Sequence, residues 1–207
     1  MKRTVFGFTA AALLATGSAP AELIAVEDFD GGTPTWTNDT SSQLFVDPSS
    51  SGSEGLFIQA ASTDNANFSG NSLFGQDLLG ESGEPSLPSP WTFTFDNIDT
   101  SAYTDLVVSF DYAVSANADA GSYILVIDGV DQAPVEFYND PDSGVETGTP
   151  TIIVGTANTI GLKITGTLNG GSDTLELDNF EINGVPEPGS LALLGLGGLL
   201  VVRRRRG

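Results

Sequence analysis

The strongest constraint on the fold is an alternation of apolar and polar side chains with a period of two residues. Every second position from 106 to 114 is apolar, namely Leu106, Val108, Phe110, Tyr112 and Val114. Because successive side chains of a β-strand point to opposite faces of a sheet, this spacing predicts a strand with one face in the core. The same alternation occurs in 160–165 and 92–95. No helical pattern of ten or more residues occurs between Ala21 and the C-terminal apolar segment.

Turn-forming residues recur every eight to twelve positions through the body of the chain, and short runs rich in β-branched and aromatic residues lie between them. This organisation is typical of an all-β fold, a two-sheet antiparallel β-sandwich. Asp128-Gly129 predicts a turn inside a hairpin from Tyr123 to Tyr138, because Asp and Gly both tolerate positive φ. The other predicted strands are 23–29, 56–60, 123–127, 135–138, 151–154 and 174–182. Loops are predicted over 47–55 and 82–90 from their Ser, Gly and Pro content.

The side chains that are missing exclude several kinds of chemistry. The 207 residues include no Cys and no His. A thiol nucleophile, a Ser-His-Asp triad, a disulfide and a zinc site with nitrogen or sulfur ligands are therefore excluded. A small carboxylate-dependent enzyme acting on polysaccharides stays open as an alternative, because two carboxylates about 5 to 9.5 Å apart suffice for glycoside hydrolysis. With 26 carboxylates in residues 22–184 such a pair occurs by chance, so we expect no enzyme.

The charge is distributed very unevenly along the chain. Residues 22–184 carry 26 carboxylates and one ammonium group, that of Lys163, for a net charge of −25. Such a surface repels phosphate backbones and anionic lipid headgroups, so nucleic acid is not an expected partner. Cations are the natural counterpart of this surface, and the acidity itself indicates binding of divalent ions or adaptation to saline water. We therefore expect salt to stabilise the body.

The first 21 residues have the three parts of a secretory signal peptide. Lys2 and Arg3 form a basic start, an apolar run covers 5–15, and the small residues Ala19 and Ala21 stand at the −3 and −1 positions before Glu22. This order predicts export and cleavage by signal peptidase after Ala21. Residues 1–21 are accordingly interpreted as an N-terminal signal helix, and residues 22–184 as the β-sandwich domain.

The last 23 residues, 185–207, combine three further features. The triplet Pro186, Glu187 and Pro188 precedes an apolar segment, 190–202, and four arginines, Arg203, Arg204, Arg205 and Arg206, follow that segment. Thirteen residues make a helix of about 20 Å, which is short for a hydrocarbon core of about 30 Å. The arginines predict that this end stays cytoplasmic while the acidic body lies outside.

The ordered combination of triplet, short Leu/Gly-rich helix and arginine cluster resembles the PEP-CTERM sorting signal of bacterial envelope proteins. The resemblance implies that an exosortase, a membrane protease-transpeptidase, recognises the triplet, removes the tail and delivers the body to the cell envelope, outer surface or extracellular matrix. Contact with the membrane is then transient and limited to the C-terminal segment. The alternative is a permanently tail-anchored envelope protein.

The first and last strands of the body resemble those of jelly-roll modules of the carbohydrate-binding and concanavalin-like kind. The residues that carry this resemblance are 23–31 and 175–182, with 92–95 and 106–112 similar to accessory β-sandwich domains of secreted proteins. The resemblance implies a non-catalytic binding or structural module, with extracellular polysaccharide as a candidate partner. Aromatic side chains would then stack on sugars. The aromatic candidates are Trp36, Trp91, Tyr103 and Tyr138, although each is also a candidate for ordinary core packing.

The last predicted strand changes phase in its middle, since Leu175 and Leu177 set one alternation and Phe180 and Ile182 the opposite one. This slip predicts a β-bulge near Asp178-Asn179 that re-aims the Asp178 side chain. In the modules that this chain resembles, acidic residues on the adjacent first and last strands often hold a structural calcium ion. The candidate ligands for one Ca²⁺ are Glu27, Asp28, Asp30 and Asp178, because calcium prefers carboxylate and carbonyl oxygens. The alternative is a polar bulge beside acidic residues that face water.

Overall fold

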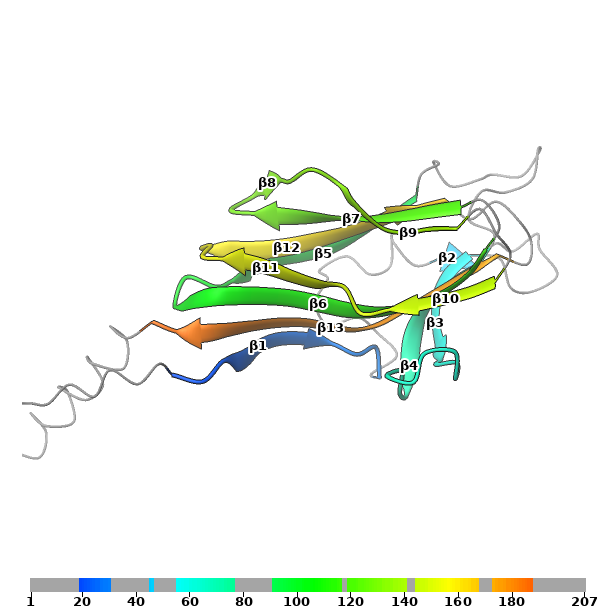
Figure 1. The fold of residues 1–207 in the computed structure, drawn as a ribbon, viewed down its shortest axis with the longest axis horizontal. Helices are drawn as coiled ribbons and strands as arrows, with labels where there is room; N and C mark the ends of the chain where they lie inside the picture. The colour runs from blue at the N-terminus through cyan, green and yellow to red at the C-terminus, as the bar shows by residue number, and fades with distance from the viewer. Residues whose placement is uncertain are drawn as a thin grey trace, which may run out of the picture.

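The computed structural model describes residues 19–30, 45–46, 55–76, 91–116, 119–140, 144–167 and 173–187. Two antiparallel sheets face each other as the layers of a β-sandwich (Figure 1). This confirms the predicted all-β, two-sheet antiparallel architecture. The predicted signal helix and the C-terminal apolar helix lie outside the described residues, as do the predicted loops apart from Gly55. None of the described segments forms an apolar helix of membrane-spanning length.

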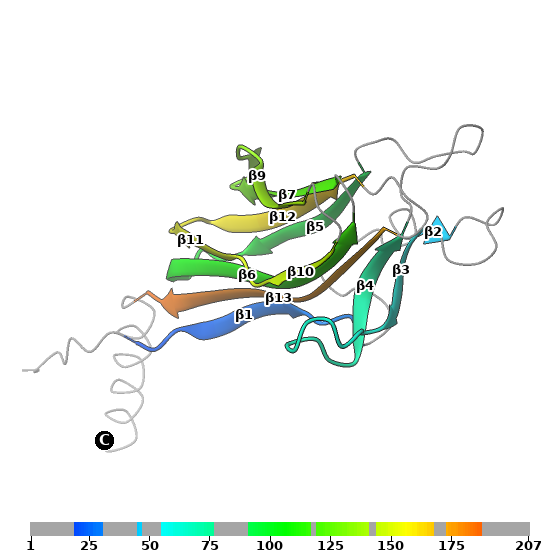
Figure 2. The ribbon, with the colours of Figure 1, turned by 45° about the vertical axis from the view of Figure 1, so that its right-hand side comes forward.

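The larger sheet, sheet A, has eight strands and is built around β13. Along one path its order is β10-β6-β13-β4-β3-β2, with β1 paired to the C-terminal half of β13 and β11 paired to β6. Its strands are β1 (Glu22–Glu27), β2 (Phe45–Val46), β3 (Gly55–Ala60), β4 (Asn71–Gln76), β6 (Tyr103–Ala116), β10 (Gly144–Gly148), β11 (Thr151–Gly155) and β13 (Thr174–Pro186). Figure 2 shows β3 and β4 turned steeply away from the direction of β1 and β13.

The smaller sheet, sheet B, has five strands in the order β5-β12-β7-β8, with β9 also paired to β7. Its strands are β5 (Trp91–Asp99), β7 (Asp119–Ile127), β8 (Val130–Asp131), β9 (Val135–Asp140) and β12 (Thr159–Gly166). The turn between β7 and β8 has Asp128 at φ +51° and Gly129 at φ +78°. These values confirm the predicted turn, because two successive positive φ angles match the right-handed twist of a hairpin.

Aromatic rings from both sheets form the centre of the core. Phe110 of β6 and Phe180 of β13 stack with ring centroids 5.2 Å apart. Phe95 of β5 lies 4.3 Å from Phe180, and Phe137 of β9 lies 5.3 Å from Phe110. The side chains of Phe95, Phe110 and Phe180 are at most 1% exposed. Burial of such large rings provides the main stabilisation of a sandwich.

Three strands of sheet A were not among the predicted strands, namely β2, β4 and β10. The sequences of β4 and β10, NSLFGQ and GVETG, contain few apolar residues, and β2 has only two residues. The predicted strand 23–29 also ends earlier than expected, since β1 ends at Glu27 and Phe29 takes a left-handed conformation with φ +53°. Phe29 is nonetheless completely buried. Its apolar side chain therefore packs in the core from a turn, which periodicity alone does not distinguish from a strand.

Candidate functional site

The predicted bulge in β13 is confirmed. The pairing of β13 with β6 shifts register between Asp178 and Glu181, and Asn179 has φ +52°. The left-handed residue turns the strand so that Phe180 and Ile182 enter the core, as Leu177 does on the other side of the bulge. Asn is one of the few residues other than Gly that adopt this conformation readily.

A network of hydrogen-bonded polar side chains surrounds this bulge, with Asp111 buried and its partners Asn67 and Thr149 exposed. Asp111, opposite Asp178 on β6, accepts hydrogen bonds from the Asn179 amide nitrogen at 2.9 Å and the Asn67 amide nitrogen at 3.0 Å. The Thr149 hydroxyl also donates to Asp111. Asn179 donates in addition to the carbonyl of Asn67 at 3.0 Å. The network therefore connects the bulge to the loop after β3 and to the turn between β10 and β11.

The Asp178 carboxylate is completely buried beside other carboxylates. It accepts hydrogen bonds from the backbone nitrogens of Asn179 at 2.8 Å and Ser69 at 3.3 Å. Burial, with a smaller contribution from the negative charges of Asp30 and Asp111, raises the pKa of Asp178 to about 7 although these two hydrogen bonds lower it. This carboxylate is therefore stabilised by a proton or a nearby cation.

Of the four predicted calcium ligands, Glu27 and Asp30 lie near the β13 bulge that carries Asp178. Glu27 is 1% exposed, pairs with Phe180 in the register of β1, and accepts a hydrogen bond from the backbone nitrogen of Phe29 at 3.0 Å. Asp30 accepts one from the backbone nitrogen of Asn71 at 2.9 Å. Asp28 is exposed and caps the backbone nitrogen of Asp30 at 3.1 Å.

Within the described segments, no group of three or more acidic side chains is arranged so that it could hold one metal ion. Glu27, Asp30 and Asp178 are instead hydrogen-bonded to backbone nitrogens. The calcium ion stays a prediction, which the Asp178 experiment in the Discussion tests. Asp111 and Asn179, the most connected members of the network, were not among the predicted site residues. Asp111 could have been noticed in the sequence as a carboxylate within the predicted strand 106–114, on the face opposite its regularly spaced apolar residues.

A groove of about 330 Å³ opens at one edge of the sandwich, between β9 of sheet B and the turn from β10 to β11 of sheet A. Figure 1 shows β9 and β10 at the same end of the two layers. Aromatic rings, one proline and several polar groups line this groove. Its residues are Tyr112, Tyr123, Val135, Glu136, Phe137, Gly148, Thr149, Pro150 and Thr151.

The aromatic wall of the groove is fixed by packing and hydrogen bonds. The rings of Tyr112 and Phe137 lie 5.0 Å apart in an edge-to-face arrangement. The Tyr112 hydroxyl donates to the Glu146 carboxylate at 2.9 Å, and burial together with this contact raises the pKa of Tyr112 to about 12. A Cβ atom at Gly148 would lie 2.7 Å from the Tyr112 ring, so only glycine lets this strand approach so closely. The hydroxyl therefore remains protonated and the ring is held in one orientation.

Of the aromatics chosen from the sequence, the two whose side chains the structure describes do not line this groove. Tyr138 is 2% exposed and belongs to the core, and Tyr103 is half-buried at the start of β6. Trp36 lies outside the described residues, and for Trp91 only the backbone is described, at the start of β5. Tyr112, Tyr123 and Phe137 have the same periodicity as core residues, so the sequence carries no signal that sets them apart.

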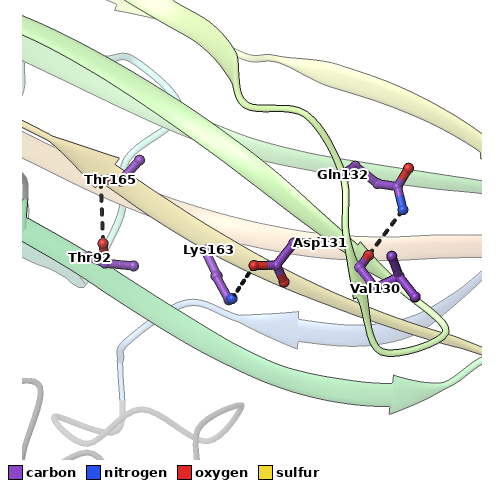
Figure 3. Close-up of polar contacts among 6 residues, drawn as sticks. All are labelled: Thr92, Val130, Asp131, Gln132, Lys163 and Thr165. Carbon is purple, nitrogen blue, oxygen red and sulfur yellow. Dashed lines mark hydrogen bonds and ion pairs between the residues drawn. The ribbon is translucent and has the colours of Figure 1, made fainter.

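The outer face of sheet B is polar. Lys163, the one basic residue of the body, forms an ion pair with Asp131 at 2.6 Å. Figure 3 shows this pair beside the hydrogen bond between Thr92 and Thr165 and the contact of Gln132 with the Val130 carbonyl. Lys163 of β12 is thus paired with a residue of β8, the next strand but one in sheet B. It also lies outside the aromatic groove, whose described lining residues include no basic side chain.

Comparison with known families identifies the C-terminal region. Residues 184–206 match the PEP-CTERM protein-sorting motif. This confirms the predicted sorting signal, whose triplet contains Pro186, Glu187 and Pro188. The motif implies an exported, exosortase-processed protein of the cell surface. No curated protein matches the chain in sequence.

Solved structures resemble the body distantly. The carbohydrate-binding module TmCBM61, solved with β-1,4-galactotriose, is 10% identical, with a TM-score of 0.45 over 75% of this chain and 93% of its own. The xylan-binding domain CBM22-1 of Xyn10C from Paenibacillus barcinonensis is 13% identical, with a TM-score of 0.41 and coverages of 83% and 99%. The K1 cleaved adhesin domain of Lys-gingipain from Porphyromonas gingivalis W83 is also 13% identical, with a TM-score of 0.42 and coverages of 76% and 96%.

Proposed function

We propose that the protein is a surface or extracellular-matrix protein whose β-sandwich binds a neutral extracellular carbohydrate, without catalysis, in the groove at the sandwich edge. The observation that carries this proposal is the aromatic wall, in which the rings of Tyr123 and Phe137 are half-buried and pack with buried Tyr112, beside the polar side chains of Glu136 and Thr151. Sugar rings combine apolar C–H faces with hydroxyl groups, so a site for them needs flat apolar surface next to hydrogen-bonding groups.

The charge of the body supports a neutral ligand. With a net charge of −25 over residues 22–184 and no basic side chain in the groove, an anionic polysaccharide would be repelled. A non-catalytic role is supported by the absence of His and Cys from the whole chain. The one lysine of the body, Lys163, is paired with Asp131 on another face.

A pair of matched substitutions tests the groove. Val135 lines the groove and is 45% exposed, while Val130 is 62% exposed and lies outside it. Val135→Arg places a long charged side chain at the groove without changing the core, and Val130→Arg makes the same change elsewhere on sheet B. In affinity electrophoresis through neutral β-linked polysaccharides, we expect retardation of the native protein and of Val130→Arg. For Val135→Arg we expect at least a tenfold loss of affinity.

Thermal unfolding of both variants provides the control, because substitutions at exposed positions change stability by about 0.5 kcal/mol or less. Equal retardation of the two arginine variants would contradict the groove as the site. Failure of every neutral polysaccharide to retard the folded native protein would contradict the carbohydrate ligand. Release of reducing ends from any of these polysaccharides would favour the alternative of a carboxylate-dependent enzyme.

A further inference from the structure

The sorting motif begins inside the folded domain. The motif covers 184–206, while β13 continues to Pro186, so the two overlap over three residues. Gly184 lies opposite Glu22 of β1 on one side of the strand. On the other side, Val185 and Pro186 lie opposite Thr104 and Tyr103 of β6. The main chain that leads into the triplet is thus a strand of sheet A rather than a linker, and Figure 1 shows its end beside the start of β1.

Hydrogen bonds and packing hold this end of β13. The backbone nitrogen of Glu187 donates to the carbonyl of Ala102 at 2.9 Å, and the Thr104 hydroxyl lies 3.4 Å from the carbonyl of Val185. A Cβ atom at Gly184 would lie 2.8 Å from Leu106 and 2.9 Å from Ile24. The strand therefore fits closely between β6 and β1 at this position.

Exposure changes over the last four described residues. Gly184 is buried, Val185 and Pro186 are half-buried, and Glu187 is exposed. An enzyme that cuts a peptide bond must reach its carbonyl carbon and bind the extended main chain around it. For bonds before Glu187 this would require the separation of β13 from its neighbours β1 and β6.

We propose that exosortase cuts this chain on the C-terminal side of Glu187, so that the whole of β13 through Pro186, together with Glu187, remains in the mature protein. The inference rests on the sorting role of the motif and is independent of carbohydrate binding. In this step the peptide bond after Glu187, or one further along, breaks. The acyl group passes to water or to an amine acceptor, and the apolar tail leaves with a new amino group.

Mass spectrometry of the processed protein tests this proposal. The full chain is expressed in a bacterium that contains an exosortase, recovered from the envelope or medium, and its C-terminal peptide is sequenced. We expect the mature protein to end at Glu187 or at a later residue. A terminus at Pro186 or any earlier residue would overturn the proposal while leaving the sorting role intact. Retention of the whole tail through Gly207 would overturn both.

A second measurement tests the structural reason directly. The unprocessed full chain, folded in detergent, is treated with a proline-specific endoprotease, and cleavage of the Pro186–Glu187 bond is followed by mass spectrometry. We expect this bond to be cut at least tenfold more slowly in the folded protein than in the protein unfolded in urea. A short peptide of the same sequence serves as the control for protease activity in urea. Equal rates in the folded and unfolded protein would show that β13 does not protect the bond, and would overturn the proposal.

Discussion

At the scale of single residues, Asp178 is the group whose charge depends most on the fold. Its pKa is about 7 in the folded protein against 3.8 ordinarily, because it is buried near Asp30 and Asp111. The folded state therefore binds the proton more tightly than the unfolded state. The bound proton therefore stabilises the folded state fully below about pH 4, and this stabilisation is lost as the pH rises through 7.

Asp178→Asn removes this titration. We expect the difference in free energy of unfolding, variant minus native protein, to increase between pH 4 and pH 8. A difference of three pKa units corresponds to at most about 4 kcal/mol. Loss of the hydrogen bond from Ser69 lowers the stability of the variant by an amount that does not change with pH, so the change of the difference with pH reports the titration. Urea unfolding of both proteins in chelator at several pH values measures the difference. A difference that is constant with pH would contradict the raised pKa.

The same pair of proteins tests the predicted calcium ion. If Glu27, Asp30 and Asp178 contribute to a calcium site, millimolar calcium at pH 8 raises the unfolding temperature of the native protein relative to chelator, and does so much less for Asp178→Asn. An unfolding temperature of the native protein that is the same in calcium and in chelator would contradict the calcium ion and favour the alternative, a polar bulge that holds no metal.

At the scale of elements, the pairing of β7 with β9 depends on one glycine. Gly121 lies opposite Tyr138, and a Cβ atom there would come within 2.0 Å of the Tyr138 ring. Tyr138 is 2% exposed and its hydroxyl lies 3.3 Å from the carbonyl of Thr167. Its ring therefore has little room to move. We expect Gly121→Ala to lower the free energy of unfolding by about 1 to 3 kcal/mol, the usual cost of overpacking.

The control for this prediction is the same substitution in a background without the ring. In Tyr138→Leu, Gly121→Ala should cost clearly less than in the native protein, because the two nearest ring atoms are absent and only the contact with the Phe137 ring, at 2.9 Å, remains. A double-mutant cycle measured by urea unfolding gives the coupling between the two positions. Additive effects would show that the ring does not cause the destabilisation.

At the scale of the whole molecule, the dominant feature is the net charge of −25 over residues 22–184. Charges of one sign repel each other more in the compact state than in the unfolded chain. The distance over which they act falls from about 30 Å in 0.01 M salt to about 3 Å in 1 M salt. We therefore expect the urea midpoint of residues 22–187 to rise with NaCl, in the presence of chelator so that divalent ions do not contribute.

The control for the salt effect is potassium chloride, which has the same ionic strength and should give the same increase. A midpoint that does not change between 0.01 M and 1 M salt would contradict self-repulsion as a source of instability. Guanidinium chloride is unsuitable as the denaturant because it is itself a salt, and would screen the charges during the measurement.

Features that depend on the local spacing of residues could be predicted from the sequence alone. The period of two in 106–114 specified β6, the phase slip between Leu177 and Phe180 specified the bulge, and Asp128-Gly129 specified the turn after β7. The sorting motif was readable for the same reason, since its triplet, apolar segment and arginines follow one another directly. Each of these features is set by neighbouring residues, so no knowledge of distant contacts is needed.

Only the tertiary structure decided which strands are neighbours. Asn67, Asp111 and Asn179 meet because β13 pairs with β6 and the loop after β3 lies against both. The groove exists because β9 of one sheet faces the turn between β10 and β11 of the other. The position of Val185 and Pro186 inside β13 likewise follows from their partners on β6. Alternation specifies which face of a strand is buried but not which strand lies beside it, because that choice depends on contacts between residues far apart in the chain.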